Sequence, residues 1–247
     1  MRGSMQKFSR LILVAGCLGA VGNFSNPLPS IAQDPKGATG KRPPVCEGSP
    51  PTGRVRCNYE GGDNYEGDFV NGKPDGRGIY VYSNGDRYEG QFRNGIPNGQ
   101  GVFIFKDDAR YSGLFQDGAM KSGTVLFTNG DRYTGEFQVV RNVANGQISS
   151  QPHGQGEFRY ANGDRFVGRF FAGVPFGPGV LTRPDGTVCE GQFLNSTLDA
   201  RNAQCRFSNG VRYQGELRKG VPHGLGTMTD SSGRRFTGAF REGKLAK

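Results

Sequence analysis

The chain has 247 residues, of which 42 are glycine and 14 are proline, a level that suggests repetition and excludes an ordinary mixed globular domain. Tryptophan is absent while Phe (18) and Tyr (9) are frequent, so we expect an aromatic core spread along the chain and not one compact core. The net charge is +9, and +6 without the first 32 residues, which is too mild to favour nucleic acid as a partner.

Residues 1–32 have the pattern of a secretory signal peptide. Three basic residues and no acid precede the apolar run 11–22, and the small-residue site Ser30-Ile31-Ala32 follows it. This run is shorter than the roughly 20 residues that a membrane-spanning helix needs. We therefore predict an exported protein, periplasmic or extracellular, that begins at Gln33.

A second interpretation of the same segment stays open. The sequence Val14-Ala15-Gly16-Cys17 resembles the lipobox of bacterial lipoproteins, in which the cysteine is acylated and becomes the new N-terminus. On that interpretation Cys17 anchors the protein to a membrane. Residues 33–45, rich in Pro and Gly, are predicted to be a spacer under either interpretation.

From residue 65 onward a five-residue motif recurs, with an aromatic residue first, Gly third and usually Phe fifth. Its copies start at Tyr65, Tyr88, Tyr111, Tyr133, Phe166, Cys189, Tyr213 and Phe236. The spacing is close to 23 residues except for an insertion at residues 138–151, which we interpret as a surface loop. A period of this length indicates a solenoid or array.

Each unit contains two short alternating runs that are separated by Asn-Gly turns. In the run 87–92, Tyr88, Gly90 and Phe92 share one face, which is the predicted core face, and the other residues share the opposite face. Asn-Gly favours the primed turns of β-hairpins. We predict an all-β, elongated, single-layer array of stacked β-hairpins, in which an isolated hairpin would not fold.

The motif Tyr-Glu-Gly-x-Phe-x-Asn-Gly, followed by Gly-x-Gly, an aromatic strand and Asn-Gly-Asp, resembles the MORN (membrane occupation and recognition nexus) repeat. The resemblance covers about residues 46–243, with a degenerate unit at 46–64. It implies a twisted single sheet of hairpins and a scaffold or adaptor role. The sixth unit departs from the pattern, because residues 195–204 replace its Gly-x-Gly, so its turn must be built differently.

Four cysteines occupy two repeat positions twice over. Cys189 stands at the first aromatic position and Cys205 near the position of Tyr80, and Cys46 and Cys57 repeat this arrangement. If the two positions face each other across a hairpin, their Cβ atoms lie within disulfide reach. We predict the pairs Cys46–Cys57 and Cys189–Cys205, and an even cysteine count agrees with an exported chain.

No motif for catalysis, metal or cofactor binding stands out. His153 and His223 occupy one repeat slot that elsewhere accepts Asp75, Asn98 and Phe176, so we interpret the slot as a turn position. Gly-x-Gly recurs, but no helical segment follows it to form a dinucleotide site. The sequence predicts a protein that is not an enzyme and has no cofactor.

Two surface patterns remain as candidate binding sites. Arginine precedes the motif in six units and would form a row on the non-core face, a candidate anion strip: Arg87, Arg110, Arg132, Arg165, Arg212 and Arg235. Apolar residues on that face in the first two units form a candidate docking patch: Ile79, Val81, Val102 and Ile104. The leading hypothesis is an exported scaffold that binds a protein partner or itself, and the alternative is a binder of anionic lipid headgroups or acidic polysaccharide in the cell envelope.

Overall fold

The computed structural model of the protein describes residues 43–141 and 148–246. The signal peptide, Cys17 and most of the spacer lie outside these residues. The described part contains 18 β-strands and no helix: β1 (Val45–Gly48), β2 (Gly53–Asn58), β3 (Asn64–Val70), β4 (Lys73–Val81), β5 (Arg87–Arg93), β6 (Ile96–Ile104), β7 (Arg110–Gln116), β8 (Ala119–Leu126), β9 (Arg132–Arg141), β10 (Ile148–Arg159), β11 (Arg165–Phe171), β12 (Val174–Thr182), β13 (Val188–Phe193), β14 (Ala200–Arg206), β15 (Arg212–Arg218), β16 (Val221–Thr229), β17 (Arg235–Arg241) and β18 (Lys244–Leu245).

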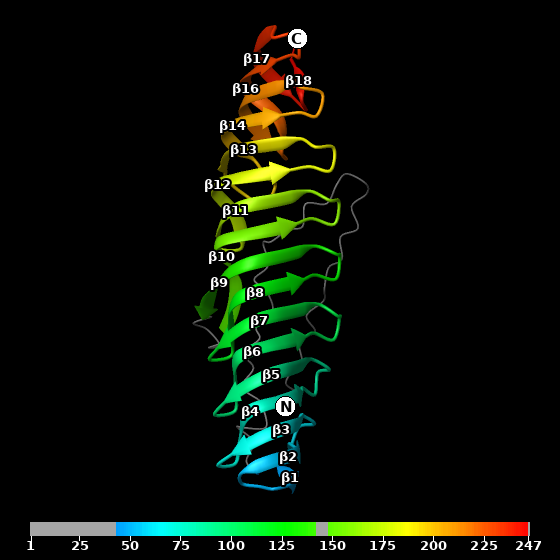
Figure 1. The fold of residues 1–247 in the computed structure, drawn as a ribbon, viewed down its shortest axis with the longest axis vertical. Coiled ribbons are helices and arrows are strands. Elements are labelled where there is room, and N and C mark those ends of the chain that lie inside the picture. The colour runs from blue at the N-terminus through cyan, green and yellow to red at the C-terminus, as the bar shows by residue number, and fades with distance from the viewer. Residues whose placement is uncertain (1–42, 142–147, 247) are drawn as a thin grey trace, which may run out of the picture.

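The strands form one open sheet in which each strand pairs antiparallel with its neighbours in the sequence. They lie across the long axis of the molecule, from β1 at one end to β17 and β18 at the other (Figure 1). The predicted all-β array of stacked hairpins is confirmed. Each of the eight motif copies falls in an odd-numbered strand between β3 and β17.

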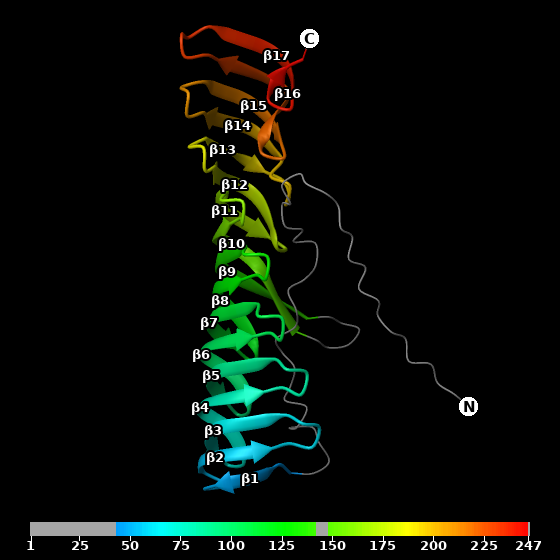
Figure 2. The same ribbon diagram turned by 90° about the vertical axis from the view of Figure 1, so that its right-hand side faces the viewer.

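The core lies on one face of this sheet and is built mainly from aromatic side chains. Tyr65 and Phe69 are 1% and 3% exposed although no second layer covers them in the described part of the chain. The pairing of β3 with β4 shifts register between Gly67 and Phe69, and such a bulge bends a strand, which lets the hairpin close around its own aromatic residues. Figure 2 shows the stack of hairpins from the side.

Successive repeats are joined by ring contacts between the first aromatic residue of one unit and the Phe of the next. The centroids of Tyr65 and Phe92 are 5.4 Å apart in an edge-to-face arrangement, and those of Tyr88 and Phe115 are 5.2 Å apart. Tyr213 and Phe240 repeat the contact near the C-terminal end of the sheet, at 5.1 Å. Each repeat therefore completes the core of its neighbour, as expected for an array whose single hairpins are not stable.

The central glycines of the repeats face each other across the sheet and form a row that we call the glycine ladder. The register joins Gly67 to Gly78, Gly78 to Gly90 and Gly90 to Gly101. A Cβ added to Gly78 would lie 2.5 Å from Cε2 of Tyr65, because the tyrosine ring lies directly against the backbone there. Gly78 is therefore needed to make room for the ring and not for a special backbone angle.

A second set of contacts ties the turns of successive repeats together. Oδ1 of Asp63 accepts a hydrogen bond from the Ser83 amide at 2.8 Å, and Oδ1 of Asp131 accepts one from the Ala161 amide at 2.7 Å. Asp164 holds the same turn position, but the corresponding residue of the next repeat is Pro184, which has no N–H. The turn aspartates thus bond to backbone amides of the following repeat, except where proline interrupts the series.

The insertion at residues 138–151 differs from the predicted surface loop. Residues 138–141 lengthen β9 and residues 148–151 lengthen β10, with Val139 opposite Ser150 and Val140 opposite Ser149. The insertion extends an existing hairpin because its β-branched residues continue the hydrogen-bonded pairing of the strands that it joins. Residues 142–147 lie outside the described part.

The cysteines join facing strands in the two pairings that the sequence predicts. Cys46 lies opposite Cys57, with their Cα atoms 4.1 Å apart, and Cys189 lies opposite Cys205, at 4.0 Å. In the sixth unit, which contains Cys189 and Cys205, the turn is built differently from the other repeats, as predicted. Oδ1 of Asn195 accepts hydrogen bonds from the amides of Thr197 and Asp199, both at 3.1 Å.

Candidate functional site

The face of the sheet opposite the aromatic core carries two parallel rows of side chains. The row that we call the arginine row contains all six predicted arginines in one register line, and two further arginines from second strands of hairpins complete it: Arg87, Arg110, Arg132, Arg159, Arg165, Arg206, Arg212 and Arg235. The sequence pattern did not identify Arg159 and Arg206, because they are not part of a repeated motif. Their positions opposite Arg165 and Arg212 in the predicted hairpins could have identified them.

A second row, which we call the middle row, runs beside the arginine row and next to the glycine ladder. Its residues are acidic and apolar in the first repeats, small hydroxyl residues next, acidic and apolar again in the middle of the sheet, and amides and threonines toward the C-terminal end: Glu66, Ile79, Glu89, Val102, Ser112, Thr124, Thr134, Glu157, Val167, Val180, Glu190, Gln204, Gln214, Thr227 and Thr237. The two rows therefore offer different chemistry at the two ends of the sheet.

The four residues of the predicted docking patch lie on this face but do not touch in one continuous surface. Ile79 and Val81 come from β4 and Val102 and Ile104 from β6, and β5 lies between them. On β5 the Arg87 guanidinium pairs with Glu89, with 2.9 Å between Nη2 and Oε2. The patch is thus two apolar ribs on either side of an ion pair.

Part of the arginine row is neutralised by neighbouring acids. The Glu157 carboxylate pairs with Arg159 and with Arg165, the latter at 2.7 Å. The hydrogen bond from Arg165, supported by that from Arg159, holds the pKa of Glu157 below its usual value although partial burial opposes this, and it raises the pKa of Arg165. Arg110, Arg132, Arg206, Arg212 and Arg235 form no ion pair with any residue in the described ranges.

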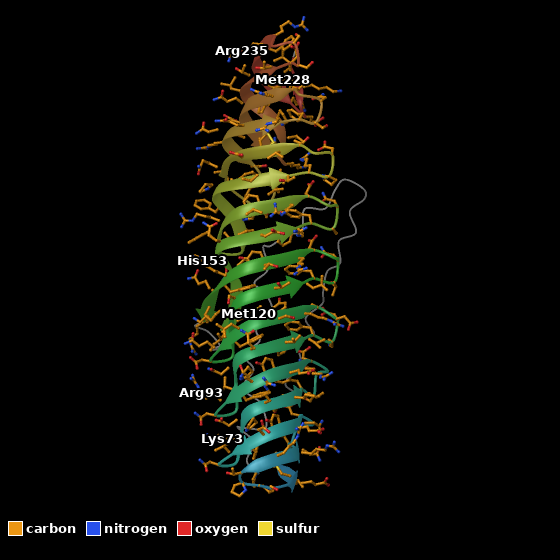
Figure 3. The ribbon with its side chains drawn as sticks, in the orientation of Figure 1. Lys73, Arg93, Met120, His153, Met228 and Arg235 are labelled. Carbon is orange, nitrogen blue, oxygen red and sulfur yellow. A yellow bond between two sulfur atoms is a disulfide. The ribbon has the colours of Figure 1, made fainter. Side chains whose placement is uncertain are left out.

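Two grooves follow the rows at opposite ends of the sheet. The first crosses β2 to β7, and it is lined by glycines of the ladder and by charged and amide side chains, among them Glu66, Asp68, Arg77, Gln91 and Gln100. The second crosses β13 to β17 between the arginine row and the middle row, and it is lined by Arg206, Arg212, Arg235, Gln204, Gln214 and Thr227. Figure 3 places Arg235 near the end of the molecule opposite to Lys73.

The two histidines do not come together. His153 makes a ring contact with Phe171, with 5.5 Å between centroids, while the backbone oxygen of His223 accepts a hydrogen bond from the Tyr213 hydroxyl at 3.1 Å. Phe171 and the neighbouring Phe176 are 58% and 52% exposed. Among the residues that the structure describes, no group of His, Cys, Asp and Glu could hold a metal ion.

The repeat position that His153 and His223 occupy carries hydrogen bonds in the first repeats. Oδ2 of Asp75 accepts one from the Asn94 amide at 3.0 Å, which again joins one repeat to the next.

Burial raises the pKa of the core tyrosines, to about 12 for Tyr59. These hydroxyls belong to the core packing. Within residues 43–141 and 148–246 there is no helix long and apolar enough to cross a membrane.

Five segments of the chain match the MORN repeat: residues 65–87, 88–110, 150–165, 166–188 and 213–233. These matches support the resemblance to the MORN repeat that the sequence indicated. The matches omit the hairpin that contains Cys189 and Cys205, where the aromatic and glycine positions are both replaced. No curated protein sequence is significantly similar to the chain.

Several solved structures resemble parts of this fold. The TCP domain of Drosophila melanogaster SAS-4, in complex with a proline-rich motif of Ana2, is 14% identical with a TM-score of 0.32, and the match covers 86% of this chain and 99% of that one. The TCP10 domain of Danio rerio CPAP is 17% identical with a TM-score of 0.31, over 80% of this chain and 95% of that one. Virginiamycin B lyase from Staphylococcus aureus reaches 12% identity and a TM-score of 0.18, over 87% and 73%. We draw no functional argument from similarities at this level.

Proposed function

We propose that the protein is a non-enzymatic repeat scaffold of the cell envelope that binds another protein, or a second copy of itself, through the outer face of β4 to β7. The observation that carries the proposal is the pair of apolar ribs around the Arg87–Glu89 ion pair. Val81 is 38% exposed, and Ile79, Val102 and Ile104 are half-buried. Contact with a partner would remove this apolar surface from water.

MORN repeats support a scaffold role, and the chemistry of the described residues agrees with it. The acids and arginines of the outer face stand in open grooves on a curved sheet, whereas catalysis usually needs a pocket that excludes water. The hydroxyls with strongly raised pKa values are core tyrosines such as Tyr88 and Tyr111, which burial keeps protonated.

Export is the second part of the proposal. The disulfides Cys46–Cys57 and Cys189–Cys205 suit an oxidising compartment. Intact mass spectrometry of the protein from its own envelope fraction tests this, and it also separates the two forms of the N-terminus. A start at Gln33 supports a soluble exported protein and an acylated Cys17 supports a lipoprotein, whereas an unprocessed Met1 with all five cysteines as free thiols contradicts export.

Site-specific photo-crosslinking in the host tests the docking face. A crosslinker at Val102 should yield a discrete adduct, with a second copy or with one other protein, that is lost when Ile79 is changed to Lys. Thr227 is the matched control, because it lies in the same middle row at the other end of the sheet. Equal adducts from both positions, or none from Val102, would refute the proposed face.

The alternative function, binding of anionic lipid headgroups or acidic polysaccharide by the arginine row, is supported only in part. Arg87, Arg159 and Arg165 already have acidic partners, so the row is not one continuous anion strip. Surface ion pairs of this kind add little stability, about 0–1 kcal/mol, but they reduce the charge that a ligand meets. The remaining unpaired arginines concentrate toward the C-terminal end.

A further inference from the structure

The groove across β13 to β17 combines three arginines with neutral hydrogen-bonding side chains. One wall is the arginine row, with Arg206, Arg212 and Arg235. The other wall is the middle row, with Gln204, Gln214, Thr227 and one acid, Glu190. The floor is formed by Cys205 and Tyr213, which are held in place by the disulfide and by core packing.

The three guanidinium groups have no ion-pair partner within the described part of the chain, and repulsion between them opposes folding. Arg206 lies directly opposite Arg212 in the register, and like charges in facing positions destabilise a sheet. Arg235 follows two strands further on, with Thr229 between. None of the three forms an ion pair or a side-chain hydrogen bond with another described residue, and Glu190 alone offsets their charge among the residues that line the groove.

A comparison with the repeat of Arg87 shows why the arginines of the groove are not neutralised. Two residues after Arg87 stands Glu89, which pairs with it. Two residues after Arg212 stands Gln214, and two after Arg235 stands Thr237. An amide or a hydroxyl can donate and accept hydrogen bonds without cancelling charge, and the same holds for Ser112 and Thr134 in the middle repeats.

We propose that this groove binds an acidic polysaccharide, a linear chain of sugars with carboxylates, which lies along the molecule across β13 to β17. The guanidinium groups of Arg206, Arg212 and Arg235 bind the carboxylates, and a guanidinium can bind a carboxylate through two parallel hydrogen bonds. Gln204, Gln214 and Thr227 bind sugar hydroxyls on the opposite wall. Because strands lie about 4.8 Å apart, Arg212 and Arg235 present charges at roughly twice that spacing along one line.

The shape of the site favours a polymer over a membrane surface. The groove crosses the strands and lies between two rows of side chains, so a single extended chain fits along it. Binding to a bilayer gains much of its strength from apolar side chains that enter the acyl region. None of the residues that line this groove is a large apolar side chain exposed to solvent. The proposal does not depend on the docking face of β4 to β7.

The test measures binding of polygalacturonate oligosaccharides to the processed, disulfide-bonded chain by titration calorimetry. The triple variant Arg206→Gln/Arg212→Gln/Arg235→Gln should weaken binding at least about tenfold, since each lost contact is a charge-assisted hydrogen bond. The matched variant Arg87→Gln/Arg110→Gln/Arg132→Gln removes the same charge from the same row outside the groove. It should weaken binding less than about threefold, through long-range electrostatics alone.

Equal losses in the two triple variants would overturn the proposal, because they would show attraction to net charge and not to the groove. It would also be overturned if the chain bound phosphatidylglycerol vesicles but not the oligosaccharide. All six arginines lie on the outer face, so neither variant should unfold below the wild-type temperature. If one does, Arg212→Lys keeps the charge and removes the paired hydrogen bonds. It should still weaken binding several-fold, and unchanged affinity would count against the site.

Discussion

A comparison of two kinds of repeat in this protein explains why glycine is required in one of them. In the unit of β3 and β4 the ring of Tyr65 packs against Gly78 of the glycine ladder. In the unit of β13 and β14 the disulfide Cys189–Cys205 replaces the aromatic pair, and the ladder position is held by Ala203, which is fully buried.

The N-terminal unit repeats this exchange with a larger side chain. Cys46 replaces the tyrosine, and Val55 stands in the ladder opposite Gly67 with 3% exposure. Where the tyrosine ring is absent, its space is filled by the methyl group of Ala203 or by the side chain of Val55. The size allowed in the ladder is therefore set by the side chain that packs on it, so the ring and the glycine must change together.

The largest effect is expected when a Cβ is added under a ring. Gly78→Ala should lower the free energy of unfolding by about 3 kcal/mol, because the new methyl would overlap the Tyr65 ring and the backbone of its neighbours leaves little room to move. Denaturant titration followed by circular dichroism measures it.

Gly191→Ala is the matched control in the ladder of the disulfide unit. Its Cβ would meet Ala203 at 3.2 Å and no aromatic ring among its nearest contacts, so the loss should be about 1 kcal/mol. Equal losses for the two variants would contradict the idea that the ring sets the requirement for glycine.

A second experiment converts one kind of unit into the other. Cys189→Tyr/Cys205→Phe should lose the disulfide and overlap Ala203, whereas adding Ala203→Gly should restore about 2 kcal/mol by making room for the ring. Thermal unfolding without reductant measures the difference. As a reference, Cys189→Ala/Cys205→Ala should lose about 3 kcal/mol from the disulfide alone. No recovery on adding Ala203→Gly would show that the two positions are not coupled.

This coupling also shows what the sequence could predict. The array, its register and the disulfides follow from the repeat because each motif position recurs in the same place on its strand, so that Cys189 and Cys205 had to face each other. The arginine row was found for the same reason. Arg159 and Arg206 escaped notice because second strands carry no fixed residue at that position.

Other features depend on contacts that no periodic pattern encodes. The ion pair of Arg87 with Glu89 divides the apolar patch, and it involves two residues on one strand whose pairing depends on rotamers. The strand extensions at 138–141 and 148–151 were mistaken for a loop because the polar residues Ser149 and Ser150 outweighed the β-branched pair opposite them. The C-terminal groove was not predicted, because it is formed jointly by the arginine row and the middle row and the sequence analysis identified only the first of them.

A smaller effect is expected at the turns, where the repeats differ in whether an aspartate reaches the next unit. Asp131→Ala should lower the free energy of unfolding by about 1–2 kcal/mol, because the Ala161 amide loses its partner. Asp164→Ala should cost less, since Pro184 offers no N–H to its carboxylate. Thermal unfolding compares the two, and a larger loss for Asp164→Ala would refute this account of the turns.

The smallest effect concerns pH and the rebuilt turn of the disulfide unit. Oδ1 of Asp199 accepts a hydrogen bond from the Lys219 amide at 2.8 Å, and its Oδ2 accepts one from Asn195 at 3.0 Å. Burial opposes ionisation, but these hydrogen bonds outweigh it and hold the pKa of Asp199 below its usual value of 3.8.

A carboxylate whose pKa is lower in the folded than in the unfolded protein stabilises the fold above the unfolded pKa, and this stabilisation is lost as pH falls through the folded pKa. Asp199→Asn should therefore lower the free energy of unfolding at pH 7 by up to about 1 kcal/mol. At pH 2 the difference from the wild type should shrink, because the wild-type carboxyl is then protonated as well. Thermal unfolding of both proteins across this range decides the matter, and a difference that stays constant with pH would mean that the charge of Asp199 does not stabilise the turn.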